Sequence, residues 1–222
     1  MITSHHNPQL QLLRRLQRTR ARRETGLFAA EGEDLLAAAE AAGWVPEARW
    51  IAGVDVDESV LAKVSALGSG SRVAGVYRQR WAEAPTGPLC VCLWGVGDPG
   101  NVGAVLRSAL AFGAGSVALG PGCADPFGPK AVRASMGAIF AVPVARVERV
   151  DELPAPRIGL DARADEALRG PADGTLVVGA ERTGLPDADY DERRSIPIQG
   201  DSLNAAMAAT VALYELTRIA RP

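Results

Sequence analysis

A glycine-rich loop opens the part of the chain whose residues could do chemistry. Gly95-Val96-Gly97-Asp98-Pro99-Gly100 stands between an apolar stretch typical of a strand, 89–94, and a predicted helix, 103–112. G-x-G-x-x-G at such a junction is the fingerprint of dinucleotide binding. That fingerprint requires an acid at the end of the next strand to hold the ribose hydroxyls, but here the strand ends in Leu119-Gly120-Pro121. A dinucleotide-binding oxidoreductase is therefore kept only as an alternative.

Several polar side chains beyond this loop stand at predicted strand ends and helix starts. Arg107, on the helix after the loop, could face a bound phosphate or ribose, or form a surface ion pair. Asn101 offers a donor and an acceptor, although Asn after Gly is also ordinary turn chemistry. Glu181 follows an apolar strand, at the edge where open α/β sheets bind ligands. Ser202 and Asn204 bracket the start of the last predicted helix, where capping explains them as well as catalysis does.

A cluster of arginines near the N-terminus is the strongest local charge. Six arginines stand between residues 14 and 23 with no acid among them. Interleaved leucines predict an amphipathic helix with an arginine-rich outer face. Because guanidinium groups match phosphate geometry, an RNA or DNA backbone is the natural partner, and a solvated helix face is the alternative. The residues expected to contact nucleic acid are Arg14, Arg15, Arg18 and Arg22.

Strands and helices alternate on both sides of a segment rich in proline and glycine. That segment, 83–88, is the predicted linker between a small α/β domain at 1–82 and a larger domain at 89–222. Predicted strands cover 27–32, 49–52, 72–77, 89–94, 116–119, 141–144, 157–160 and 175–178. Predicted helices cover 33–42, 59–66, 103–112, 131–136 and 202–219. This alternation predicts an open parallel α/β layout for the second domain.

The composition is that of an ordinary globular protein. Lysine and arginine number 24 against 26 acids, a net charge of −2, which excludes a strongly basic nucleic-acid wrapper but not local patches. Three cysteines cannot build a disulfide framework, and with both histidines near the N-terminus no metal site is expected. We expect a reducing, cytoplasmic setting without a membrane span or a signal peptide.

Three stretches of the second domain, taken in order, carry a resemblance to a known family. They are Asp98–Gly113, Leu176–Leu185, and Ile196–Ile198 followed by Ser202–Ala209. They resemble the motifs of the SpoU (TrmH-type) family of RNA ribose methyltransferases, within the SPOUT superfamily. Pro126–Val144 also matches the middle section of that family. Ala205, Ala206 and Met207 replace the family's usual Val-Ser-Val, and we interpret these differences as helix-packing changes.

The resemblance implies an α/β fold of two parts. Phe28–Gly32 and the apolar helix after it resemble the start of the L30e-like domain that binds substrate in many family members. The second part would be a SPOUT-type methyltransferase domain with a trefoil knot at its C-terminal end. The family also implies a homodimer whose cofactor pocket lies near the subunit interface.

The resemblance further implies the reaction and the residues that carry it. The expected enzyme uses S-adenosylmethionine to methylate a ribose 2′-hydroxyl in structured RNA, rRNA in preference to tRNA. A non-catalytic RNA-binding protein of the same fold is the other alternative. The implied catalytic group is Arg107, Asn101, Glu181, Ser202 and Asn204. In the resembled family the arginine is proposed to activate the hydroxyl, but a neutral arginine is costly, so we favour a phosphate clamp for Arg107 and keep the base role as the alternative. Glu181 would orient its neighbours. The implied cofactor-binding residues are Gly179, Ile196, Ile198 and Leu203.

Overall fold

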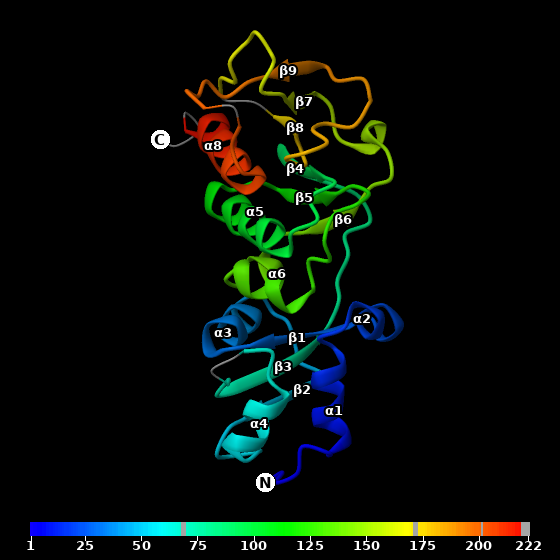
Figure 1. Cartoon of the computed structure of the whole chain (residues 1–222), viewed down its shortest axis with the longest axis vertical. Helices are drawn as coiled ribbons and strands as arrows, with labels where there is room; N and C mark the ends of the chain where they lie inside the picture. The colour runs from blue at the N-terminus through cyan, green and yellow to red at the C-terminus, as the bar shows by residue number, and fades with distance from the viewer. Residues whose placement is uncertain (68–69, 171–172, 201, 219–222) are drawn as a thin grey trace.

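The computed structural model of the chain contains two β-sheets, one on each side of residues 83–88 (Figure 1). It describes residues 1–67, 70–170, 173–200 and 202–218. The first sheet is antiparallel with strand order β1-β3-β2, and the second is parallel with order β6-β5-β4-β8-β7-β9. The strands are β1 (Leu27–Glu31), β2 (Ala48–Ile51), β3 (Val73–Arg78), β4 (Leu89–Trp94), β5 (Ser116–Leu119), β6 (Val144–Arg146), β7 (Arg157–Leu160), β8 (Gly174–Gly179) and β9 (Glu192–Arg194).

Helices cover both sheets. The first sheet carries α1 (Pro8–Arg15), α2 (Thr19–Thr25), α3 (Glu33–Ala41) and α4 (Glu58–Val64). The second carries α5 (Pro99–Phe112), α6 (Pro129–Ala134), α7 (Ala138–Ala141), the 3₁₀ turn η1 (Val150–Glu152) and α8 (Ala205–Thr217). Helices α5 and α8 lie side by side on one face of the parallel sheet, and α6 lies between the two sheets (Figure 1). No helix among the described residues is long and apolar enough to cross a membrane.

The parallel sheet is buried on both faces, as its continuous apolar strands predict. On β4, Leu89, Val91 and Leu93 join the core that includes α5 and α8. Cys90 and Cys92 face the other way and pack in a separate apolar cluster. Burial raises the pKa of the Cys92 thiol well above its ordinary value, so both cysteines act as small apolar core residues.

The two sheets are joined by an aromatic contact. Phe28, Trp44 and Tyr77 of the N-terminal part pack against Phe127 and Phe140 of the C-terminal part. The Trp44 indole N–H donates to the Phe140 carbonyl at 2.8 Å. Aromatic packing of this kind, with a satisfied polar group, holds the N-terminal part against the second sheet at a fixed position.

Several predicted element boundaries are wrong, and local capping explains two of them. Helix α5 begins at Pro99, before the predicted 103, because the Asp98 side chain accepts from the Asn101 N–H. Helix α8 begins only at Ala205, after the predicted 202, because Asn204 is its N-cap. The predicted end of that helix at 219 lies outside the described residues. The predicted strand at 141–144 is instead the end of α7 and the start of β6. Strand β9, with two arginines and a glutamate, was not predicted because it lacks apolar alternation.

Candidate active site

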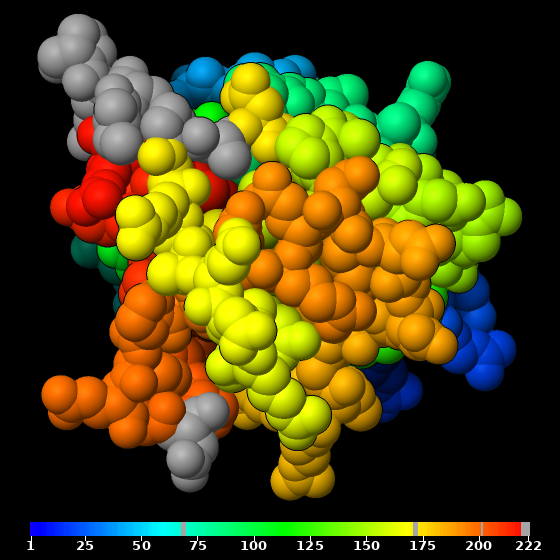
Figure 2. Space-filling view, turned by 90° about the horizontal axis from the view of Figure 1, so that it is seen from above, coloured from blue at the N-terminus to red at the C-terminus, as the bar shows by residue number. Residues whose placement is uncertain are grey.

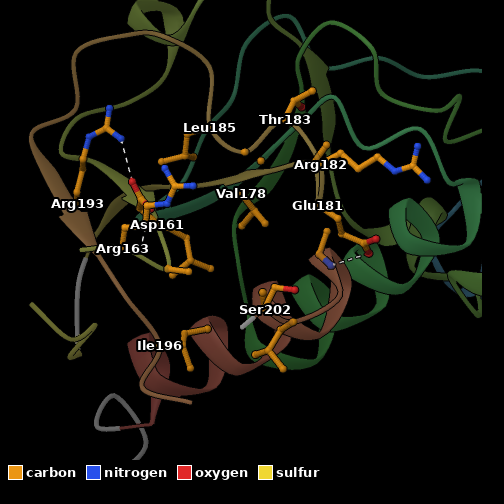
Figure 3. Close-up of a pocket in the computed structure, with 18 of the residues that line it drawn as sticks. Asp161, Arg163, Val178, Glu181, Arg182, Thr183, Leu185, Arg193, Ile196 and Ser202 are labelled. Atoms are coloured by element: carbon orange, nitrogen blue, oxygen red, sulfur yellow. Dashed lines mark hydrogen bonds and ion pairs between the residues drawn. The ribbon is translucent and has the colours of Figure 1, made fainter. Parts of the chain in front are cut away.

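A cavity of about 460 Å³ lies where the carboxyl ends of β7 and β8 meet the segment that leads into α8 (Figure 3). Viewed along the long axis of the molecule, the residues near 160–170 and those near 180–200 lie side by side over this end of the chain (Figure 2). Open α/β sheets bind ligands at this edge. The cavity is lined by six of the predicted catalytic and cofactor residues, which are Gly179, Glu181, Ile196, Ile198, Ser202 and Leu203.

The loop after β8 turns back tightly over the end of its own strand. The Gly184 N–H donates to the Ala180 carbonyl at 2.8 Å, and Gly184 adopts a φ of +67°. A Cβ atom on Gly179 would collide with the Gly184 carbonyl oxygen. Glycine at 179 therefore lets the loop close, and the closed loop forms one wall of the cavity.

Three elements distant in the sequence meet at the side chain of Asn204. Its Nδ2 donates to Glu181 Oε1 at 2.8 Å and to Asn101 Oδ1 at 3.2 Å. Its Oδ1 accepts from the backbone N–H groups of Ala206 and Met207 at 3.0 and 3.3 Å, which caps α8. The structure thus brings Asn101, Glu181 and Asn204 together, as the sequence motifs imply for one site.

Glu181 lies at the positive end of a helix. Its Oε1 also accepts from the Ala205 N–H at 3.3 Å, and its side chain points toward the start of α8 (Figure 3). The first turn of a helix favours negative charge, because its N–H groups are unpaired within the helix. The carboxylate is therefore held in place by two donors and by the helix dipole.

Charged residues that sequence reasoning missed lie at the opposite side of the cavity. The Arg193 guanidinium pairs with Asp161 at 3.2 Å (Figure 3) and lies 4.8 Å above the ring of Tyr190. Burial raises the pKa of Tyr190 to about 12, and its hydroxyl donates to the Pro186 carbonyl at 3.1 Å. Asp161 directly follows the predicted strand 157–160, so its position at the carboxyl edge was the available signal.

Arg107 is not brought into the cavity of the single chain. It is exposed on α5, six residues beyond Asn101, and forms no ion pair with any described residue. Six residues advance an α-helix by about 9 Å and turn it onto a different face. Near the start of the same helix, Asp98 pairs with Lys130 at 2.7 Å, and the hydrogen bond from Lys130 lowers the pKa of that carboxyl.

The predicted N-terminal arginine helix is two helices, α1 and α2, and one of its arginines is buried. Arg14, Arg15 and Arg18 are exposed, as predicted. Arg22 has only 3% of its side chain exposed and pairs with Asp125 at 2.7 Å. The prediction that Arg22 contacts nucleic acid is therefore wrong, because the loop between β5 and α6 covers its guanidinium.

Comparison with known proteins agrees with the sequence motifs. The model of the SpoU rRNA Methylase family matches residues 88–214. Over nearly its whole length, 97% of this chain and 98% of the relative, the chain is 28% identical to the 23S rRNA (guanosine(2553)-2′-O)-methyltransferase RlmP of Bacillus subtilis. It is 37% identical over 144 residues to the 23S rRNA (uridine(2479)-2′-O)-methyltransferase of Streptomyces viridochromogenes, which covers 54% of this chain. The chain spans 49% of that relative and 26% of another curated one.

The solved structures agree with both sheets and their arrangement. An AdoMet-bound rRNA methyltransferase from Sinorhizobium meliloti superimposes with a TM-score of 0.89 at 29% identity, covering 100% of this chain and 98% of that one. The fold and the site define an α/β protein with a cavity at the carboxyl edge of a parallel sheet, the edge where open α/β sheets bind ligands. The chain belongs to the SpoU rRNA methylase family, which confirms the resemblance carried by the three motifs.

Proposed function

We propose that the chain transfers a methyl group from S-adenosylmethionine to a ribose 2′-hydroxyl in structured RNA, with rRNA as the substrate class. The meeting of Asn101, Glu181 and Asn204 beside the cavity carries this proposal. Full-length similarity to RlmP and to the AdoMet-bound S. meliloti enzyme supports it. A cytoplasmic location belongs to the same proposal.

The residues of the cavity fit S-adenosylmethionine. The cavity volume of about 460 Å³ lies within the range of roughly 300–1,000 Å³ usual for small-molecule sites. Apolar side chains, Val178, Ile196 and Leu203 among them, would hold the adenine ring, and the loop that closes over Gly179 would supply backbone hydrogen-bonding groups. The Glu181 carboxylate is suited to the positive charges of the cofactor. When bound, the cofactor supplies an electrophilic methyl group on a positively charged sulfur.

The polar cluster would position the ribose. A 2′-hydroxyl is a poor nucleophile, so its orientation and the removal of its proton are what the protein must supply. Glu181 holds the Asn204 amide, and that amide holds Asn101, so the carboxylate fixes the direction of both amides. Ser202 is exposed on the cavity wall, where its hydroxyl can hydrogen-bond the substrate.

We assign Arg107 to phosphate clamping in a homodimer. Its guanidinium carries a delocalised positive charge and five N–H donors that match phosphate oxygens, so holding RNA phosphate suits it better than acting as a base. Leu110, one turn further along α5, is exposed, as are Met207, Val211 and Tyr214 of α8. A face with four large exposed apolar side chains on two neighbouring helices is suited to a second copy of this chain. Arg107 borders that face, and we propose that in the dimer it lies near the partner's cavity.

Methylation of rRNA from cells that lack the gene tests the proposal. The purified chain is incubated with that RNA and methyl-labelled S-adenosylmethionine, and 2′-O-methylnucleosides are mapped by mass spectrometry. Label at one or a few riboses is expected, and folded protein that forms no 2′-O-methylnucleoside would overturn the proposal. Calorimetry with S-adenosylmethionine and with NAD separates the alternatives, because a non-catalytic relative binds the first without transfer and an oxidoreductase binds the second.

A further inference from the structure

A second cleft, of about 570 Å³, lies where the N-terminal part meets the edge of the parallel sheet. Its walls come from the end of α2, the end of β3, the segment after β3 and the end of β6. It is lined by Arg23, Gly26, Arg78, Gln79, Trp81 and Arg146. None of these residues belongs to the site described above. Of the features noted in the sequence, only the arginine cluster contributes to this cleft, through Arg23.

The cleft is positively charged. Three of its six lining residues are arginines, and no acidic side chain lines it within the part of the chain that the structure describes. Arg78 pairs with Glu47 at 3.1 Å. Arg23 and Arg146 are exposed and form no ion pair with any described residue. Two unpaired guanidinium groups beside one cleft attract an anion.

The floor of the cleft is held rigidly. The Trp81 indole N–H donates to Gln79 Oε1 at 3.3 Å, and the Gln79 amide donates in turn to the Leu27 carbonyl at 3.2 Å. The Trp81 ring packs edge-on against Phe127 with centroids 5.1 Å apart. The Arg146 guanidinium lies 4.0 Å over the Trp81 ring. A guanidinium is planar, and the contact with the indole ring fixes the orientation of that plane, so that its N–H groups are held ready for a phosphate.

The cleft lies at the same edge of the sheet as the cofactor cavity. The strand register places Arg146 beside Leu119 and Leu119 beside Leu93, while Trp94, the next residue, is beside Gly179. Arg146 and Gly179 are therefore level to within one residue and separated by three strand spacings, roughly 14 Å at ~4.8 Å each. An RNA strand of a few nucleotides can span both sites.

We infer that this cleft binds the sugar–phosphate backbone of the substrate RNA, through Arg23 and the Arg146–Trp81 stack, while a nearby ribose occupies the active site. The inference rests on the proposed function for the identity of the nucleic acid. Backbone contacts fix the position of RNA without reading its bases. The cleft therefore sets the register of the substrate and takes no part in the methyl transfer step.

The double variant Arg23→Gln, Arg146→Gln tests this contact in the full chain. Binding of a fluorescein-labelled RNA hairpin is followed by anisotropy over a salt series. Loss of two phosphate contacts should reduce the slope of log affinity against log salt by about 1.4–1.8, since each contributes roughly 0.7–0.9. The KM for RNA should rise, with kcat and S-adenosylmethionine affinity unchanged. Arg72→Gln is the matched control: Arg72 is exposed just before β3, at the end opposite Arg78, and its slope should stay that of the parent.

Two results would overturn the inference. The first is a slope in the double variant equal to that of the parent, and the second is an equal fall in slope for Arg72→Gln. Lysine at position 146 keeps the positive charge. The variant Arg23→Gln, Arg146→Lys should therefore recover about half of the slope that the double glutamine variant loses. A slope that stays as low as in the double glutamine variant excludes a phosphate contact at 146. Failure of the proposed function is visible separately, as parent protein that transfers no methyl group to undermethylated rRNA.

Discussion

Replacing Arg22 by methionine should lower the free energy of unfolding by about 3 kcal/mol, the lower end of the 3–5 kcal/mol measured when one partner of a buried ion pair is removed. The Arg22 side chain is 3% exposed, and its guanidinium lies 2.7 Å from the Asp125 carboxylate. It also donates to the Leu16 carbonyl at 2.8 Å and to Thr19 Oγ1 at 3.0 Å. Methionine fills the space of the side-chain stem but leaves all three acceptors without their donor.

The partial exposure of Asp125 explains why the expected loss in the free energy of unfolding lies at the lower end of that range. Its side chain is 19% exposed, so water can partly solvate the carboxylate once Arg22 is gone. Its other oxygen keeps the Phe127 N–H at 3.0 Å. Arg20 provides the matched control, because it stands on the same helix but is 87% exposed and pairs with Glu24 at i,i+4. Arg20→Met should cost only about 0.3–0.5 kcal/mol.

Urea denaturation of both variants and of the parent, followed by tryptophan fluorescence, measures these differences. A double-mutant cycle with Asp125→Asn should give a coupling energy above about 1 kcal/mol. The reasoning is refuted if the free energies of unfolding of Arg22→Met and Arg20→Met differ by less than about 0.5 kcal/mol, which is the size of effect expected for surface substitutions. The salt dependence of RNA binding should not change in Arg22→Met, since the guanidinium is covered.

Further outcomes follow from the same contacts. Calorimetry should give S-adenosylmethionine a Kd of about 1 μM, or −8 kcal/mol, and no heat at millimolar cofactor would contradict it. Arg107→Ala should lower kcat roughly 100-fold, a loss typical when a reacting group is no longer held in position, with cofactor affinity within about twofold by titration; near-normal turnover would exclude the assigned role. Asn204→Asp should keep the helix cap, and so the melting temperature within a few degrees, yet lower kcat by placing a second carboxylate beside Glu181; normal turnover would show that the amide only caps. Replacing Arg14, Arg15 and Arg18 with Gln should reduce the salt slope of RNA binding by about 2–2.7, and an unchanged slope would mark a solvated helix face.

Much of the second sheet could be predicted because its strands are continuous apolar runs. The predicted strands 89–94, 116–119 and 157–160 coincide with β4, β5 and β7. Periodicity carries that information locally. Helix starts were less accurate, since a cap depends on which side chain turns toward the backbone, as Asp98 does at α5. Strand β9 could not be predicted, because its pairing with β7 rather than its own residues makes it a strand.

Part of the candidate site was predictable in its residues, but its geometry was not. The three motifs contain Asn101, Glu181 and Asn204, and the structure joins them by hydrogen bonds. Asp161 and Arg193 on the far side of the cavity belong to no motif and were missed. Their positions depend on how β7 and β9 pair, which the sequence shows only weakly.

The arginine cluster shows why local charge cannot assign function to single residues. Arg22 and Arg23 are neighbours in one basic run, yet Arg22 is buried against Asp125, 103 positions away, and Arg23 opens onto a cleft. A helix turns by about 100° per residue, so adjacent side chains point in different directions. Which of the two meets solvent is decided by the loop that packs against α2.

Asn204 explains how so small a cluster can be rigid. One amide caps α8 through its oxygen and holds Glu181 and Asn101 through its nitrogen. The cap requires the side chain to stay over the first turn of the helix, and that same position aims the nitrogen at the other two residues. Folding of the helix therefore orients the polar cluster without a separate set of supporting contacts. Because α8 also carries the exposed apolar face proposed for dimerisation, one helix connects the subunit contact to the geometry of the site.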